Sequence, residues 1–154
     1  MIGLALVPLA LLSISCFQPA APTAQFLEYK IADITLEGIE VNFFFNVENS
    51  NPLPIDITKY DYKVYIEDQE LLNEEREGFN LPGNSKKMIK IPVMIRYSKL
   101  FGSVLAVAQR LAQGNKTLSY RIEGSISAGT LGFTFITPIK ASGTIPLPKD
   151  IKLQ

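Results

Sequence analysis

The chain has 154 residues, 47% of them hydrophobic, and its 15 basic and 15 acidic side chains cancel. The length suits one domain with one core, and the balanced charge gives no reason to expect a nucleic-acid partner. The absence of histidine excludes a His-based triad or a His-ligated metal, and the single cysteine excludes an intrachain disulfide and a multi-cysteine zinc site.

The N-terminal segment is apolar and uncharged. Residues 1–27 carry no charged side chain, and residues 1–17 are almost wholly apolar. A membrane-spanning helix needs about 20 apolar residues, so this run fits a secretory signal better. It ends in Leu-Ser-Ile-Ser-Cys, which resembles a bacterial lipobox, the motif whose cysteine receives a diacylglycerol before the signal is cut away. We therefore predict a lipoprotein-type signal peptide at residues 1–16, with lipidation at Cys16.

Two features depart from the lipobox pattern. Ser13 stands where Leu or Val is usual, and no Lys or Arg precedes the apolar run. The alternative is a chance cysteine in a plain signal or anchor helix. Lipidation is favoured because Cys16 is the only cysteine and lies at the end of the run. Residues 17–24 then resemble a Pro/Ala tether, followed by a folded domain predicted for residues 25–150.

Alternating apolar residues predict the first strands. Leu27 and Tyr29 begin one such series, and a change of parity at Ala32-Asp33 predicts a bulge or a break. From Ile39 to Val47 an apolar residue recurs at every second position, which predicts a strand with one buried face.

A proline-rich corner ends that strand. Proline removes a backbone donor and forces the preceding residue out of the helical region, while asparagine bonds its own nearby backbone. We therefore expect a rigid corner and then a new strand. The corner residues are Asn49, Ser50, Asn51, Pro52, Leu53 and Pro54.

The rest of the chain continues the alternating pattern, with one interruption. Strands are predicted near residues 60–66, 71–80, 89–97, 118–126, 131–135 and 139–143. Pro92 lacks a donor, which predicts a sheet-edge position for its strand. No βαβ rhythm appears, so we predict a mainly β fold, an antiparallel β-sandwich of seven or eight strands.

Helical spacing replaces the alternation over residues 98–113. We predict one amphipathic helix there, with Ser98 as its N-cap and Gly114 as its stop. Its expected role is to close one end of the sandwich. The alternative is a membrane-surface helix, since three cations lie near its ends: Lys99, Arg110 and Lys116.

Three features in order resemble the type 2 late embryogenesis abundant family, whose module is called the water stress and hypersensitive response (WHy) domain. They are the corner at residues 49–54, the single helix after a basic strand, and the ending Gly-Thr-Ile-Pro-Leu-Pro at residues 143–148. The family motif is Asn-Pro-Asn followed by proline, so Asn49, Asn51 and Pro52 match it, whereas Ser50 replaces its first proline.

The resemblance implies a fibronectin type III-like or immunoglobulin-like sandwich with one helix, no catalytic residues and no cofactor. It also implies an association with desiccation and other stress, and bacterial members are often exported or lipid-anchored. We therefore expect a non-enzymatic, monomeric lipoprotein held to a membrane at Cys16, in an extracytoplasmic space, that binds or protects membranes or proteins. In a Gram-negative cell Phe17 favours the outer membrane, because inner-membrane lipoproteins commonly carry Asp there.

Two other functions remain open. A lipid- or hydrophobic-ligand-binding module could use a groove between the sheets lined by five phenylalanines, namely Phe43, Phe44, Phe45, Phe133 and Phe135. An acidic stretch could bind Ca²⁺ or act as an acid/base pair, although its spacing is not that of an EF-hand. Its members are Asp61, Glu67, Asp68, Glu70, Glu74, Glu75 and Glu77.

The charges themselves are unevenly placed. Residues 28–77 hold 13 acids and 4 bases, a net charge of −9, whereas residues 78–122 hold 8 bases and no acid, a net charge of +8. Either the two blocks pair across the fold, or the surface is polarised and its basic side faces anionic lipid or an acidic partner.

Overall fold

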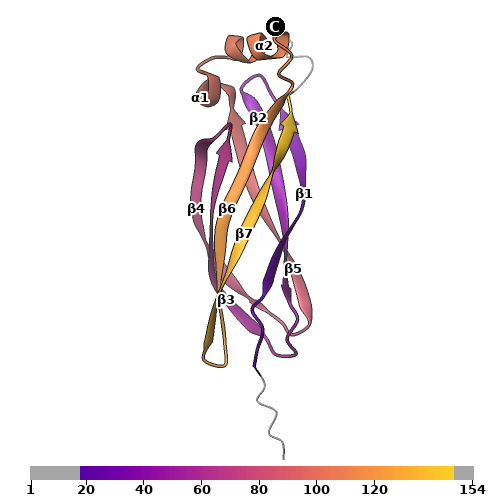
Figure 1. Ribbon diagram of the computed structural model, residues 1–154, viewed down its shortest axis with the longest axis vertical. Coiled ribbons are helices and arrows are strands. Elements are labelled where there is room, and N and C mark those ends of the chain that lie inside the picture. Colours follow the sequence, from indigo (N-terminus) through magenta and orange to yellow (C-terminus); the bar gives the residue numbers. More distant parts are fainter. Residues whose placement is uncertain (1–17, 148–154) are drawn as a thin grey trace, which may run out of the picture.

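A computed structural model describes residues 18–147 of the chain. These residues form seven antiparallel strands in two sheets, with two helices at one end (Figure 1). One sheet has the order β1-β2-β5 and the other β4-β3-β6-β7, which confirms the predicted mainly β sandwich. The elements are β1 (Thr23–Ile34), β2 (Gly38–Asn49), β3 (Ile55–Ile66), β4 (Gln69–Leu81), β5 (Ser85–Arg96), α1 (Tyr97–Phe101), α2 (Val104–Ala112), β6 (Thr117–Thr130) and β7 (Phe133–Pro146).

The core lies between the two sheets and follows from the alternation in sequence. Every second residue of β2 from Ile39 to Val47 is fully buried. Phe43 pairs with Ile91 of β5 on one side of β2, and its ring lies 4.9 Å from that of Tyr120 in the opposite sheet. Burying side chains of this size stabilises the fold by about 1.5–3 kcal/mol each, so β2 is the central contributor to the sandwich.

Strand β1 is irregular in two places. The register with β2 shifts between Ile31 and Asp33 within one continuous strand, so of the bulge or break predicted from the change of parity the bulge is confirmed. A second shift lies between Phe26 and Glu28 and was not predicted. It turns Phe26 toward the core and leaves Leu27 48% exposed, because one extra residue moves the following side chains to the other face.

Strand β5 forms one edge of its sheet, as Pro92 predicts. Pro92 pairs in register with Asn42 of β2, and β5 is the last strand in the order β1-β2-β5. A proline is tolerated at this position because the outer edge of a sheet needs no donor from it.

The prediction of a single helix over residues 98–113 was wrong. Gly102 has φ of 76°, a left-handed conformation that ends α1, and its N–H donates to the Ser98 carbonyl. Ser103 is then extended and its side chain accepts from the N–H of Ala106, so it caps α2. The residue at the N-cap position of α1 is Arg96 rather than Ser98, and the C-cap of α2 is Gln113, one residue before Gly114. Apolar residues keep helical spacing across Gly102, so the sequence pattern does not show the break. The left-handed backbone conformation of Gly102 shows it.

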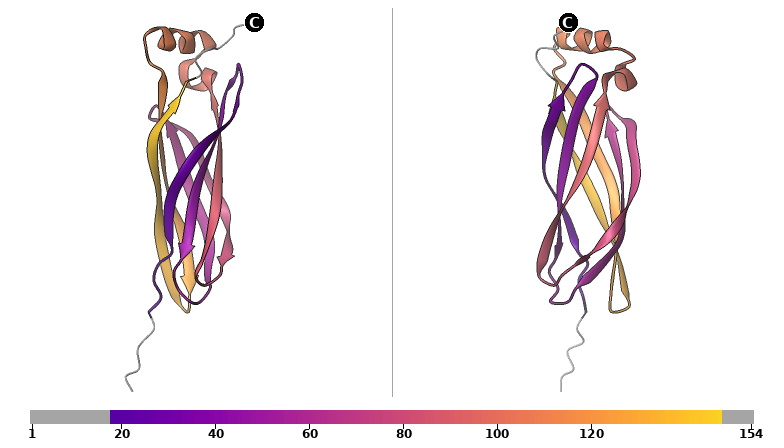
Figure 2. Two further views of the ribbon diagram at one scale, coloured as in Figure 1. Left: turned by 90° about the vertical axis from the view of Figure 1, so that its right-hand side faces the viewer. Right: turned by 180° about the vertical axis from the view of Figure 1, so that it is seen from behind.

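The sandwich has two unlike ends, which all three views show (Figure 2). At the helix end lie α1, α2 and the β3–β4 turn. We call the other the corner end. It comprises residues 18–22, the β2–β3 corner at residues 49–54, the β4–β5 turn and the β6–β7 turn.

Candidate functional site

The β2–β3 corner is organised by the side chain of Asn49. This side chain is fully buried, and its amide N–H groups donate to the carbonyls of Leu53, Leu81 and Pro82 at 2.9, 3.2 and 3.1 Å. Its oxygen accepts from both the backbone and the side-chain nitrogen of Asn51. One asparagine thus supplies hydrogen-bond partners to backbone groups of both the corner and the neighbouring β4–β5 turn.

Asn51 extends this network to the N-terminal segment. Its Oδ1 accepts from the N–H of Ala20 at 2.7 Å, and its Nδ2 donates to the Ala20 carbonyl at 2.8 Å. Two residues later the carbonyl of Pro22 accepts from the buried hydroxyl of Thr137 at 2.7 Å. Residues 18–22 fall within the predicted tether, and their backbone is therefore held against the end of the sandwich.

The predicted structural motif is brought together in part. Asn49 and Asn51 share one buried network, whereas the rings of Pro52 and Pro54 are exposed. The Pro54 carbonyl accepts a hydrogen bond from the Thr130 hydroxyl of β6. The Pro52 carbonyl lies so close to Gly83 that a Cβ at position 83 would be only 2.2 Å from its oxygen. The predicted lipidation site, Cys16, lies outside the described residues.

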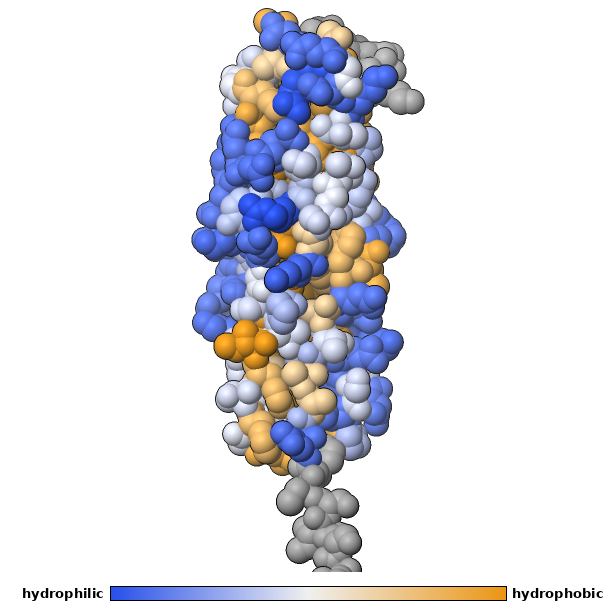
Figure 3. Space-filling model, in the orientation of Figure 1, coloured by the Kyte–Doolittle hydropathy of each residue, from blue (hydrophilic) through white to orange (hydrophobic). Residues whose placement is uncertain are grey.

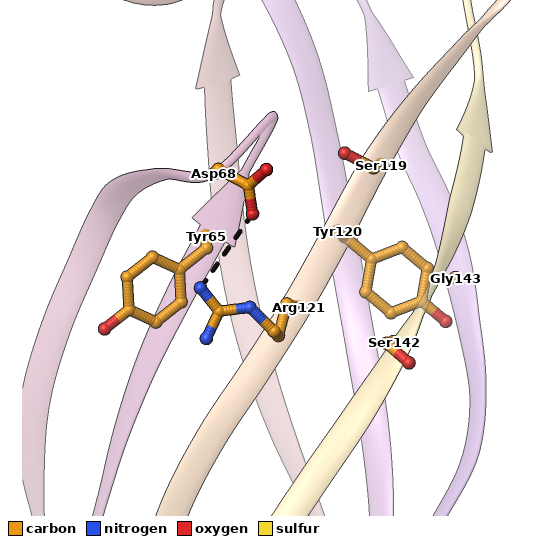
Figure 4. Close-up of a pocket in the computed structure, with 7 residues that line it drawn as sticks. All are labelled: Tyr65, Asp68, Ser119, Tyr120, Arg121, Ser142 and Gly143. Carbon is orange, nitrogen blue, oxygen red and sulfur yellow. Dashed lines mark ion pairs between the residues drawn. The ribbon is translucent and has the colours of Figure 1, made fainter.

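A hollow of about 280 Å³ lies on the four-stranded sheet near the helix end (Figure 4). Tyr65 and Asp68 reach it from β3 and the β3–β4 turn, Arg121 from β6, and Gly143 from β7. In Figure 4 the Arg121 guanidinium lies between Tyr65 and Asp68, and Tyr120 points toward Gly143. A Cβ at position 143 would lie 2.8 Å from the Tyr120 hydroxyl, so a larger residue there would displace the Tyr120 ring.

The charge in this hollow is already matched. The Arg121 guanidinium stacks 4.0 Å from the centre of the Tyr65 ring and forms ion pairs with Glu123 and Asp68. The hydrogen bond from Arg121 to Glu123 raises the pKa of Arg121 further. The hollow thus lacks an uncompensated cation that would attract an anionic ligand, and sequence reasoning did not single it out.

Glu67 joins three elements at the helix end. Its carboxylate accepts from the N–H of Ser119 at 2.6 Å and from Arg110 of α2 at 3.0 Å. Burial by itself would raise the pKa of Glu67, but the hydrogen bonds from Ser119 and the charge of Arg110 together lower it below its usual value. A carboxylate with a lowered pKa is a weak base, so its contact with the Ser119 hydroxyl does not make an activated nucleophile.

Most of the other acids of the predicted stretch, Glu77 excepted, are paired with neighbours on the same sheet. Glu70, Glu74 and Glu75 form ion pairs with basic residues of β3 and β4, and Asp61 accepts from Ser125. Within residues 18–147, no cluster of three or more acids, cysteines or histidines is placed to hold a metal ion. The geometry therefore gives the acidic stretch a role in cross-strand pairing.

The two charge blocks meet at three ion pairs. Glu48 with Lys86, Glu67 with Arg110, and Asp68 with Arg121 join the acidic block to the basic one. Most other pairs lie within one block. The blocks thus pair across the fold only in part, so the structure supports the first of the two predicted arrangements in part.

The five phenylalanines proposed as a groove do not share one surface. Phe43 and Phe45 are fully buried in the core, while Phe44 points to the opposite face of β2. Phe133 is exposed near the β6–β7 turn, and Phe135 packs partly against the core. A separate shallow hollow of about 420 Å³ lies over Phe26, beside β6 and β7.

The helices show no membrane-spanning character in the described part of the chain, where none is long and apolar enough to cross a bilayer. Helix α2 packs Val107 into the core, and its Arg110 is paired with Glu67. This arrangement agrees with the predicted role of closing one end of the sandwich.

Comparison with known proteins identifies the family of the domain. A family model described as late embryogenesis abundant protein matches residues 44–143. A solution structure from Arabidopsis thaliana is similar, with 18% identity, a TM-score of 0.60, and 94% of this chain and 93% of that one covered. The solution structure of a protein described as a putative late embryogenesis abundant protein has 18% identity and a TM-score of 0.60, covering 83% of this chain and 72% of its own.

A crystal structure of a protein from Archaeoglobus fulgidus is also similar, with 12% identity, a TM-score of 0.51, and coverage of 85% and 98%. At these identities the structural likenesses concern the fold alone. No curated protein matches the chain in sequence.

Proposed function

This chain belongs to the late embryogenesis abundant protein family, and on that premise we propose that it is a non-enzymatic stress-tolerance lipoprotein built on a WHy domain. It is anchored to a membrane through lipid on Cys16 and faces an extracytoplasmic space, the periplasmic side of the outer membrane if the cell is Gram-negative. As a monomer, it binds or shields membranes or proteins when water is lost.

The observation that carries the proposal is how the domain holds its own N-terminal segment. Ala20 is fixed by Asn51 and Pro22 by Thr137, so the domain begins only a few residues after the lipobox-like Cys16. A short, fixed link of this kind suits a module that works at a membrane surface. The family membership supports the stress-related role, and the paired carboxylates described above support a non-enzymatic one.

The anchor is tested by replacing its cysteine. The Cys16→Ala chain should lose incorporation of labelled fatty acid and should leave the membrane fraction, because no thiol remains to carry the diacylglycerol. The matched control is Ser13→Leu, which brings the motif closer to the usual lipobox and should retain both label and membrane location. Equal membrane fractions and equal labelling for Cys16→Ala and the unchanged chain would contradict the anchor.

The stress role is tested in the same cells. Cells that produce the Cys16→Ala chain should survive drying no better than cells that lack the protein, whereas cells with the Ser13→Leu chain should survive as well as the wild type. Survival that does not depend on the protein would contradict the stress role while leaving the anchor intact.

A further inference from the structure

The corner end is uncharged over its whole surface-forming sequence. The four segments that meet there, residues 18–27, 49–55, 78–85 and 124–139, contain no Asp, Glu, Lys or Arg. The nearest charges lie on the adjoining strand ends, where Glu48 pairs with Lys86 and Asp56 lies in register with Gly129. The helix end, in contrast, carries charged residues such as Glu67 and Arg110. In a chain with 19% charged residues, an uncharged end that also exposes apolar side chains is a candidate contact surface.

Large apolar side chains are exposed on and near this end. They include Leu53 of the corner, Leu131 in the β6–β7 turn, which is 65% exposed, and the β7 residues Phe133 and Ile136. Figure 3 shows hydrophobic surface in the lower part of the face that it displays, toward this end, as well as at mid-height and near the helices. The Thr130 hydroxyl donates to the Pro54 carbonyl at 2.9 Å, so the turn and the corner form one continuous surface.

The tip of the β6–β7 turn is costly for the fold. Leu131 has φ of 48° and Gly132 has φ of 81°, the left-handed conformations of a two-residue hairpin turn, where Asn or Gly is preferred. A leucine held there costs about 1 kcal/mol or more and leaves its side chain in water. Leucine therefore does not stabilise the turn, and its exposed side chain is free to contact a surface outside the domain.

The N-terminal link indicates what that contact is. If Cys16 carries the lipid, only residues 17–19 separate it from Ala20, which Asn51 holds. The four residue steps from Cys16 to Ala20 span at most about 14 Å, so the lipid headgroups lie near the point where Ala20 is held. The uncharged turns are thus the part of the domain nearest the bilayer.

We propose that the corner end docks on a lipid bilayer and inserts Leu131 and Phe133 into its interface. The sandwich then stands on the membrane, and the helix end points away from it. This inference rests on the proposed function for the membrane as its partner, and it deepens that function by assigning the surface that makes contact.

The experiment uses the absence of tryptophan from the chain. Leu131→Trp places a single fluorophore at the tip of the turn. The matched control is Leu105→Trp, since Leu105 of α2 is similarly exposed, at 62%, and lies at the helix end. Each full chain, purified with its anchor, is reconstituted into vesicles of phosphatidylcholine and phosphatidylglycerol, with and without brominated acyl chains that quench only fluorophores inserted among them.

The expected result for Leu131→Trp is a blue shift and about a twofold loss of emission with brominated lipid, while Leu105→Trp changes in neither respect. Equal behaviour of the two variants, or no quenching of the fluorophore at position 131, would overturn the proposal. A blue shift that appears without vesicles and grows with protein concentration would also overturn it, because a second copy of the chain would then cover the corner end. A failed anchor is distinguishable, since it shows as lost fatty-acid labelling.

A second variant keeps the proposal testable if Leu131→Trp does not fold. Asparagine tolerates positive φ, so Leu131→Asn should keep the free energy of unfolding or raise it. In the anchored chain that also carries Phe133→Trp, Leu131→Asn should reduce the quenching by brominated lipid severalfold, because the turn loses the apolar side chain at its tip. Unchanged quenching with unchanged stability would contradict docking through Leu131.

Discussion

At the scale of single residues, Asn49 has the most exacting environment of the corner. Its amide faces three carbonyl oxygens on the N–H side and two donors of Asn51 on the oxygen side. A primary amide presents donors and an acceptor on one short planar group, and this group is fully buried. Other side chains of the same size lack one of the two functions.

Asn49→Asp tests this arrangement without changing the volume. The substitution turns the donor side into an oxygen that faces the carbonyls of Leu53, Leu81 and Pro82, so buried acceptors repel and lose their donor. We expect the free energy of unfolding, measured with urea at pH 7, to fall by about 3 kcal/mol. Ser50→Ala changes an exposed neighbour and should alter it by less than about 0.5 kcal/mol. If the two variants unfold at the same urea concentration, the network does not support the corner.

At the scale of elements, the helix end is held together by polar contacts as well as by packing. Glu67 lies in the β3–β4 turn, Arg110 on α2 and Ser119 on β6, and the three share one set of hydrogen bonds. The Arg110 guanidinium also lies 5.1 Å from the centre of the Phe101 ring of α1. The carboxylate of Glu67 therefore ties α2 to the larger sheet, while α1 is also bonded to β4 through Gln69 and Lys99.

Glu67→Gln should destabilise the domain in a pH-dependent way. The pKa of Glu67 is lower in the folded than in the unfolded chain, so its contribution is present above the unfolded value, about 4.3, and is lost as the pH falls through the folded value. We expect the variant to lose about 1 kcal/mol at pH 7, and the difference from the wild type to disappear in acid. Urea unfolding at several pH values measures it.

The control for this prediction is Glu75→Gln. Glu75 pairs with Lys59 on the outer sheet surface, and both side chains are more than half exposed, so solvent screens the interaction. No measurable change is expected at any pH. A pH-independent difference for Glu67→Gln, or an equal effect of the two variants, would show that the helix end does not depend on the carboxylate.

At the scale of the whole molecule, stability is distributed unevenly along the long axis. Strand β2 is hydrogen-bonded on both sides, to β1 and to β5, and one whole face of it is buried. Among the α2 side chains that the structure describes, Val107 is the one that is fully buried. The middle of the sandwich should therefore open last and the helix end first.

Native-state hydrogen exchange checks this distribution. We expect the amides of α2 to exchange through local opening, and those of β2 between Ile39 and Val47 to exchange only near the free energy of global unfolding. Low concentrations of urea should accelerate the β2 amides and leave α2 nearly unchanged, because only global opening exposes much surface. Equal protection of α2 and β2 would mean that the domain opens as one unit.

The sequence by itself determined the features that depend on local chemistry. Alternation from Ile39 to Val47 places one face of β2 in the core, Pro92 requires an edge position, and the Asn-Pro corner stops the strand, because side-chain period and proline geometry act within a few residues. The same local information missed the break at Gly102, where helical spacing continues across a left-handed residue, and the shift beside Leu27.

Only the tertiary structure decided the features that depend on residues far apart in the chain. The corner holds Ala20 through Asn51, Pro22 meets Thr137, and Thr130 meets Pro54; no sequence period signals contacts over such separations. The uncharged end also depends on the tertiary structure. Its four segments are far apart in the sequence, and antiparallel strands that each run the length of the sandwich bring them together.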